Sequence, residues 1–267
     1  MTLRIVAVLT APDTTALCLD AAAQAAAVSP DAAVEAFHPR LAPESFILPS
    51  EEVMTELRRS ELTAMLDGRS GAIRQSVQDW MSAAPGRSAD WREAEGDRIG
   101  PIVAEQGRAA DLVVLVRPGE AEGDAALHAA IFATGKPLLL VPPTGAGRFG
   151  RHMAVAWKAS DPAARALAAA VPWLKCAAKV SVLTAGGAGD TDEATALLAG
   201  HGISAETLRL ERDGEDVADR LLHEAHTIGA DSIVMGAYRH SQLRELILGG
   251  VTRHMLQHAD LPLFMAH

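Results

Sequence analysis

The second half of the chain alternates short apolar runs with longer amphipathic stretches. This pattern predicts strands at 152–157, 179–184, 204–210, 231–236 and 262–266, and helices at 161–176, 190–201, 214–228 and 250–259. The strands are nearly continuous apolar runs, as in parallel sheets whose two faces are covered by helices. Gly202 and Gly229 indicate helix ends, and Asp161-Pro162 indicates a helix start. Strict alternation of strands and helices favours a doubly wound α/β domain.

Three apolar runs of the first half have counterparts in the second half. The matched pairs are 4–8 with 152–156, 110–115 with 230–235, and 136–141 with 261–266. The first pair is offset by 148 residues and the second by 120, so the first half is 28 residues longer between these two runs. We place the excess around residues 43–90, where Glu51 to Asp67 is predicted as a long amphipathic helix.

The repeat predicts two tandem domains on either side of a Pro/Gly-rich linker at Pro142 to Gly147. The first domain spans 1–145, with the helical insert, and the second spans 150–267. Each is predicted to hold a five-stranded, mostly parallel sheet of Rossmann-like or flavodoxin-like type. The last strand, 262–266, is an apolar edge candidate. Because an exposed apolar edge invites association, we expect it to be covered or paired.

Composition and charge exclude several classes of protein. The net charge of −10 argues against a nucleic-acid-coating surface, which is normally basic. No stretch approaches 18 uninterrupted apolar residues and no signal peptide is evident, so we expect no membrane span and a cytoplasmic protein. Cys18 and Cys176 are the only cysteines, which is typical of reduced intracellular proteins, although a bridge between them stays open.

The last 37 residues contain the pattern of an anion-binding loop. The predicted strand 231–236 ends at Gly236, a polar stretch follows, and Gly249-Gly250 precedes Thr252 at the head of a short helix. Glycine lets the backbone approach a ligand, and the first N–H groups of a helix have no internal partner. The spacing therefore predicts a site for an anion such as a phosphate.

At these residues the chain resembles a tandem protein of the universal stress protein family. The resemblance covers essentially the whole chain, and it is strongest at 155–175 and 230–267. Nucleotide-binding members of that family carry the motif G-x2-G-x9-G-[ST], whose glycines and hydroxyl contact the ligand phosphates. They also carry an Asp just after the first strand, which meets the adenine. The resemblance further implies that the family pairs through its terminal strands.

This chain keeps part of that motif. Gly236 matches the first glycine and Gly249 the third, whereas Arg239 stands where the second glycine is expected. Gly250 stands at the Ser/Thr position, with Thr252 two residues later. The nucleotide-binding candidates implied by the resemblance are Gly236, Arg239, His240, Gly249, Gly250, Val251 and Thr252.

Two further departures concern adenine recognition and the first copy. Lys158 stands where the adenine-facing Asp is expected. The first copy has Thr10-Ala11 at the equivalent place, and the residues after Val116 lack the glycine spacing. The side chain of Arg239 either obstructs a phosphate or binds it through two parallel hydrogen bonds. Arg239→Gly is expected to raise nucleotide affinity in the first case and to lower it in the second.

Other chemistry is weakly indicated. His254 and His258 have a spacing that could place two imidazoles on one metal, but no third ligand is evident and surface histidines are the better interpretation. Gly186 to Gly189 lacks the full Rossmann spacing. No catalytic motif stands out, so we expect neither catalytic residues nor a metal.

The leading hypothesis is a cytoplasmic, non-enzymatic stress-response protein that acts through binding and signalling, with no required cofactor. The second is an adenine-nucleotide switch or slow ATPase that binds ATP or AMP in the C-terminal copy alone. A flavin or redox module of the same sheet type is a third, weaker alternative. Expected partners are the two domains, which pair within one chain, and a second copy in a homodimer.

Overall fold

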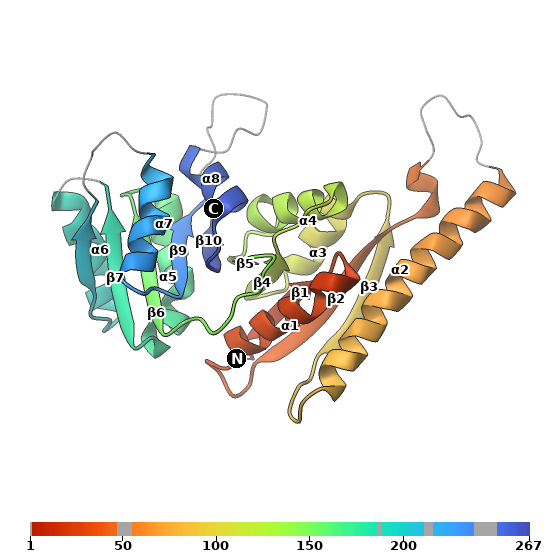
Figure 1. Ribbon diagram of the computed structural model, residues 1–267, viewed down its shortest axis with the longest axis horizontal. Helices are drawn as coiled ribbons and strands as arrows, with labels where there is room; N and C mark the ends of the chain where they lie inside the picture. Colours follow the sequence, from red (N-terminus) through yellow and green to blue (C-terminus); the bar gives the residue numbers. More distant parts are fainter. Residues whose placement is uncertain (1, 47–54, 186–187, 211–215, 238–249) are drawn as a thin grey trace. The chain divides into compact units, whose positions relative to one another are not determined.

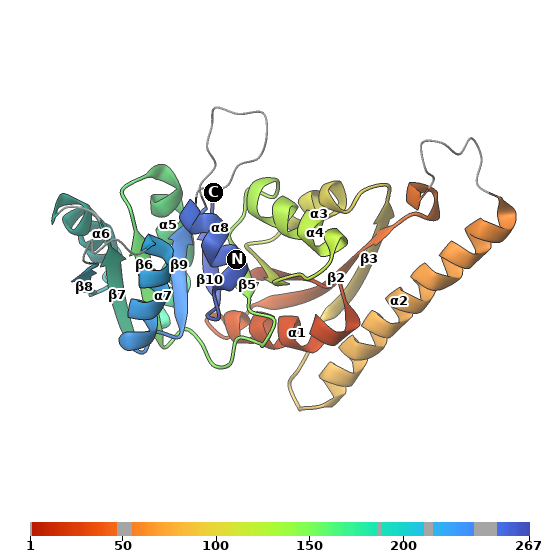
Figure 2. The ribbon, with the colours of Figure 1, turned by 45° about the horizontal axis from the view of Figure 1, so that its top comes forward.

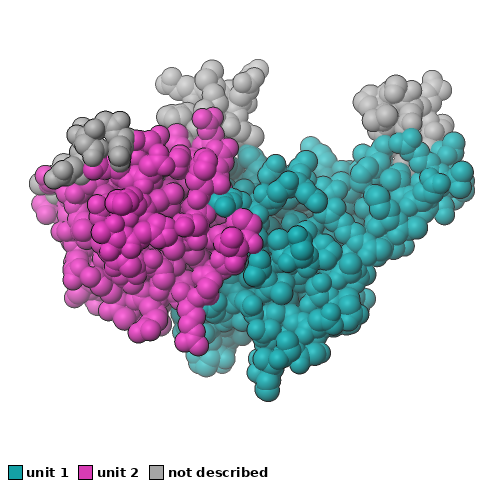
Figure 3. Space-filling model, viewed as in Figure 1, with its two compact units in different colours: residues 1–136 teal, residues 137–267 magenta. Residues whose placement is uncertain are grey.

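The computed structural model of the chain describes residues 2–46, 55–185, 188–210, 216–237 and 250–267. They form two compact units, residues 1–136 and residues 137–267 (Figure 3). Among the described helices, none combines the length and the apolar character needed to cross a bilayer. Cys18 is a buried free thiol, and Cys176 is an exposed free thiol.

The first unit is a parallel sheet covered by helices (Figure 1). Its elements are β1 (Arg4–Val8), α1 (Pro12–Ala26), β2 (Ala33–Leu41), the short 3-10 helix η1 (Pro43–Phe46), α2 (Glu56–Ser82), β3 (Asp90–Gly96), α3 (Ile99–Gly107), β4 (Leu112–Val116) and α4 (Ala121–Phe132). The strand order is β3-β2-β1-β4, and all three neighbouring pairs are parallel. Figure 2 shows α1 and α2 on one face of this sheet and α3 and α4 on the other.

The second unit repeats this plan with one antiparallel addition. Its elements are β5 (Leu138–Val141), β6 (His152–Trp157), α5 (Asp161–Cys176), β7 (Lys179–Thr184), α6 (Ala188–Gly200), β8 (Glu206–Arg209), α7 (Val217–Thr227), β9 (Ser232–Gly236), α8 (Gly250–His258) and β10 (Leu263–Ala266). The strand order is β5-β10-β9-β6-β7-β8. Every pair is parallel except β5 with β10.

The predicted fold class is confirmed: the chain is α/β, with helices alternating with the strands of a mostly parallel sheet. The predicted elements 152–157, 161–176 and 179–184 are reproduced without change as β6, α5 and β7. Gly202 and Gly229, the predicted helix ends, have positive φ angles of 74° and 71°, which glycine adopts without strain. The apolar strands fill the core because both faces of the sheet are covered.

The last strand is paired, as the sequence led us to expect. Leu263 of β10 lies opposite Leu140 of β5 in an antiparallel ladder, which satisfies the hydrogen-bonding groups of the apolar edge. For this reason the compact units divide the strands as four and six, whereas the repeat predicted five and five. The domain bounds 1–145 and 150–267 stay a prediction about the repeat.

The insert helix differs from its prediction. The sequence indicated a helix from Glu51 to Asp67, whereas α2 is 27 residues long and continues past Gly68 and Gly71 to Ser82. Residues 51–54 lie outside the described part of the chain. The face of α2 that is buried consists of Leu66, Ser70, Ile73, Val77 and Trp80. Burying a large apolar side chain contributes about 1.5–3 kcal/mol, which outweighs the cost of about 1 kcal/mol for each helical glycine.

Candidate functional site

Each unit has a point where its strand order reverses, which we call its switch point. In unit 1 it lies between β1 and β4, and in unit 2 between β6 and β9. In doubly wound sheets, ligands bind beyond the carboxyl ends of the strands at this point. The loops that follow these four strands are therefore the candidate functional sites.

The switch point of unit 2 holds a buried donor. Trp157 is the last residue of β6, lies opposite Thr184 of β7, and is 3% exposed. Its indole Nε1–H has no hydrogen-bond partner among the described residues. An unpaired buried donor costs roughly 1–3 kcal/mol, so a group of this kind needs an explanation in a native structure.

The residues after Trp157 lead into helix α5. Lys158, which stands at the predicted adenine-facing position, is exposed. Ser160 caps α5: its hydroxyl accepts a hydrogen bond from the N–H of Ala163 at 3.4 Å and donates to the carbonyl of Lys158 at 2.9 Å. The start of α5 is thus fixed beside the end of β6.

Gly236, the first motif glycine, has a packing explanation. A Cβ placed on it would lie 2.7 Å from the backbone nitrogen of Ala163 and 2.8 Å from the carbonyl carbon of Pro162. Real Cβ atoms do not approach backbone this closely, so the first turn of α5 excludes any side chain at Gly236. The glycine is needed for helix–sheet packing whether or not a ligand binds there.

The remaining nucleotide-binding candidates lie in helix α8 or outside the described residues. Gly250 is exposed at the start of α8, and a Cβ on it would meet no described atom within 4 Å. Val251 is partly buried, and Thr252 is only 1% exposed, on the buried face of α8. Arg239, His240 and Gly249 lie outside the described residues. The described geometry therefore places Thr252 in the core and Gly236 against α5.

In unit 1 a side chain of the insert helix reaches the switch point. The guanidinium of Arg69 on α2 donates to the carbonyl of Thr10 at 2.7 Å and to Glu120 Oε2 at 2.9 Å. Its second terminal nitrogen lies 3.7 Å from Glu122 Oε2. Thr10 follows β1, and Glu120 follows β4. Arg69 thus joins both loops of the switch point.

Sequence reasoning missed Arg69 because the predicted helix ended at Asp67. The spacing of Leu66, Ile73 and Val77 would have extended the helix and placed Arg69 on it. Nothing in the sequence indicates that this arginine reaches residue 10, which is 59 positions away.

Two further polar residues lie on β2 of unit 1. His38 on β2 is 4% exposed, and its Nδ1–H donates to the carbonyl of Leu9 at 2.8 Å. Burial lowers the pKa of His38, against the opposing effects of this hydrogen bond and of Glu93. Arg40, also on β2, forms ion pairs with Asp67, Glu93 and Glu95.

Two histidines of unit 2 pair with carboxylates. His254 Nε2 lies 3.0 Å from Asp219 Oδ1, and His226 Nε2 lies 2.8 Å from Asp260 Oδ1. The rings of His254 and His258 are 4.4 Å apart between centroids. Within the described ranges, no group of three His, Cys, Asp or Glu residues is arranged to hold a metal ion.

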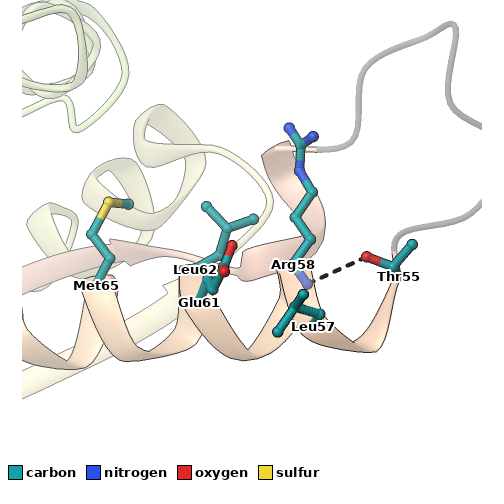
Figure 4. A pocket seen from close by; sticks show the side chains of 6 residues that line it. All are labelled: Thr55, Leu57, Arg58, Glu61, Leu62 and Met65. Carbon is teal, nitrogen blue, oxygen red and sulfur yellow. Dashed lines mark hydrogen bonds between the residues drawn. The ribbon is translucent and has the colours of Figure 1, made fainter.

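A hollow of about 350 Å³ lies elsewhere, along the first turns of α2 (Figure 4). Its described lining consists of Thr55, Leu57, Arg58, Glu61, Leu62 and Met65. Leu57 and Met65 are 72% and 56% exposed, so this is an open surface feature. It is not formed by the loops of either switch point.

Comparison with known proteins finds a family-model match in the C-terminal part of the chain. Residues 175–267 match the model of the Universal stress protein family. No curated protein matches the chain in sequence.

Solved structures share the fold along the whole chain. A universal stress protein from Archaeoglobus fulgidus DSM 4304 aligns with a TM-score of 0.62 and 14% identity, over 98% of this chain and 95% of that chain. A protein from Pseudomonas aeruginosa UCBPP-PA14, assigned provisionally to the universal stress proteins, aligns with a TM-score of 0.60 and 15% identity, over 98% of this chain and 92% of that chain. A protein of unknown function from P. aeruginosa PAO1 aligns with a TM-score of 0.59 and 15% identity, also over 98% of this chain and 92% of that chain. At these identities the likeness shows the fold alone.

Proposed function

Since residues 175–267 match the model of the Universal stress protein family, we propose that this protein is a non-enzymatic stress-response module that acts by binding. The binding site is the switch point of unit 2. The observation that carries the proposal is the buried indole N–H of Trp157, which has no partner among the described residues. A ligand with a hydrogen-bond acceptor would pair with this donor and remove its desolvation cost.

The chemistry of this site favours an acceptor-bearing, anionic ligand. The indole nitrogen of tryptophan only donates, and the neighbouring Lys158 is a cation. Trp157 and Lys158 do not form a nucleophile–base pair. Selective retention of a small molecule is therefore the activity that these groups support best.

An adenine-nucleotide switch in unit 2 is the second candidate. It is favoured by Gly250, which is exposed at the N-terminus of α8, where backbone N–H groups attract anions. It is weakened by Gly236 and Thr252, because packing against α5 and burial in the core account for these residues without a phosphate. Under this alternative ATP or AMP is the ligand.

The test begins with a census of small molecules released from the purified, denatured protein, measured by mass spectrometry. Calorimetric titrations with ATP and AMP and an ATP hydrolysis assay follow. We expect an acceptor-bearing anion to be retained without ATP turnover. Nucleotide at about one per chain would establish the second candidate. Steady ATP hydrolysis that Lys158→Ala abolishes would contradict the non-enzymatic proposal.

A matched pair of variants locates the site. Trp157→Phe removes the indole N–H but keeps an aromatic ring, and retention of the ligand is expected to fall. Trp173→Phe is the control, because Trp173 lies in the same unit and its ring packs on Phe264 at 5.3 Å between centroids. Equal ligand loss in both variants would show that Trp157 has no special role.

A further inference from the structure

The switch point of unit 1 is built from hydrogen-bond acceptors. The carbonyl of Thr10 comes from the loop after β1, and the carboxylates of Glu120 and Glu122 come from the start of α4, after β4. These groups surround one guanidinium, that of Arg69. A guanidinium offers five N–H donors in a planar fork, so a single group is able to satisfy acceptors on two separate loops.

The helix that carries Arg69 is anchored independently of this contact. Ile73 and Val77 of α2 are 0% and 1% exposed. Trp80 donates its indole N–H to Asp20 of α1 at 2.8 Å, and Arg87 reaches the same carboxylate oxygen at 2.8 Å. The position of Arg69 is therefore set by packing of α2 about one to three helical turns away from Arg69.

From this arrangement we infer that the switch point of unit 1 is a guanidinium-binding site, which the chain fills with its own Arg69. Helix α2 acts as an intrachain ligand that closes unit 1 to other molecules. This goes beyond the function proposed for unit 2. It also gives the 43–90 insert a role: the insert supplies the occupant of the site at which a doubly wound unit otherwise binds a ligand.

The experiment uses the full chain and free guanidinium as the probe. Arg69→Ala removes the occupant, and hydrogen exchange is measured on peptides that cover residues 9–11 and 119–122. Arg74→Ala is the matched control. Arg74 is exposed on the same helix, and its guanidinium lies over the ring of Trp91 rather than at the switch point. Low-millimolar guanidinium chloride, well below denaturing concentrations, is compared with sodium chloride at equal ionic strength.

We expect Arg69→Ala to lose protection at both loops and to lower the melting temperature of unit 1 by about 2–6 °C. Guanidinium should restore the protection in a saturable manner, whereas sodium chloride should not. Arg69→Lys should restore it partly, because an ammonium lacks the planar fork. The control should resemble the wild type with and without guanidinium.

Three results would overturn the inference: unchanged protection in Arg69→Ala, recovery with sodium chloride equal to that with guanidinium, or lost protection that guanidinium does not restore. If Arg69→Ala does not fold, the double variant Glu120→Gln/Glu122→Gln tests the same site from the acceptor side. It should lose protection at residues 119–122 and gain nothing from guanidinium. Wild-type protection in that variant would equally contradict a guanidinium site.

Discussion

The two switch points occupy equivalent places in two copies of one sheet, yet they differ in chemistry. In unit 1 the loops present a carbonyl and two carboxylates, and Arg69 already pairs with them. In unit 2 the same place holds Lys158 and the indole N–H of Trp157, which lacks a partner among the described residues. The same fold thus places a switch point in each unit. The side chains around it decide whether another part of the chain occupies it.

The 43–90 insert accounts for this difference. A long helix in unit 1 reaches the switch point because its buried face packs against the unit for several turns beyond Arg69. In unit 2, β7 and β8 are connected by the shorter helix α6. The two units therefore differ in the length of the helix at this place, whereas both keep a mostly parallel sheet.

The largest expected effect comes from detaching the insert helix. Ile73→Ala removes a fully buried side chain and should lower the free energy of unfolding of unit 1 by about 3 kcal/mol. It should also weaken the hold of Arg69 on the switch point. Chemical denaturation gives the free energy, with Gly71→Ala on the exposed face of α2 as the control. That control should stabilise by up to about 1 kcal/mol. Equal stability of Ile73→Ala and wild type would mean that α2 is not anchored there.

A second change acts on unit 2. Gly236→Ala places a Cβ within 2.7 Å of the backbone of Ala163, so α5 has to move away from β9. We expect a loss of about 2 kcal/mol in the free energy of unfolding. Gly250→Ala is the control and should be neutral or stabilising, because its Cβ meets no described atom. If Gly236→Ala were as stable as this control, the close approach of α5 would be wrong.

A smaller difference separates two equivalent aspartates. Asp231 accepts backbone N–H bonds from Gly150, Arg151 and His152 at 2.8, 2.9 and 3.1 Å, whereas Asp111 accepts one from Arg4 at 2.8 Å. Asp231→Ala should therefore cost about 2 kcal/mol and Asp111→Ala about 1 kcal/mol, measured by thermal unfolding. A larger cost at Asp111 would contradict this ranking.

The smallest effect at neutral pH concerns the two thiols. Burial raises the pKa of Cys18 from 9.0 to about 12, so its reactive thiolate is absent at pH 8, while Cys176 is exposed. A maleimide should label Cys176 in the native protein and Cys18 only after unfolding. The pKa of Cys18 is higher in the folded state than in the unfolded state. The contribution of Cys18 to the free energy of unfolding is therefore full below pH 9 and declines as the pH rises from 9 to about 12. Cys18→Ala should remove this alkaline decline. Rapid native labelling of Cys18 would show that α1 opens.

The sequence predicted the second half of the chain well, for reasons seen in particular elements. Helix α5 begins at Asp161-Pro162, the predicted start, and Gly202 and Gly229, which follow α6 and α7, have positive φ. Such signals act over a few neighbouring residues, so they can be recognised from the sequence alone. The helix predicted to end at Asp67 continues as α2 to Ser82, because the side chains of Ile73, Val77 and Trp80 in the following turns are buried by tertiary packing.

The candidate site was harder to predict than the fold. Gly236 was predicted as a phosphate contact, and its spacing is compatible with one, but the structure adds a reason in the backbone of α5, 73 positions earlier at Ala163. Thr252 was predicted at an open helix end and lies on the buried face of α8. For Arg239, His240 and Gly249 the prediction still rests on the sequence.

The sequence alone determined the alternation of strands and helices and the repeat of three apolar runs, because local apolar periodicity and helix caps fix the elements and their order. Only the tertiary structure decided that Arg69 fills the switch point of unit 1, that α5 excludes a side chain at Gly236, and that the donor of Trp157 is buried. Each of these depends on contacts between segments far apart in the chain, and such contacts form only when the elements have packed.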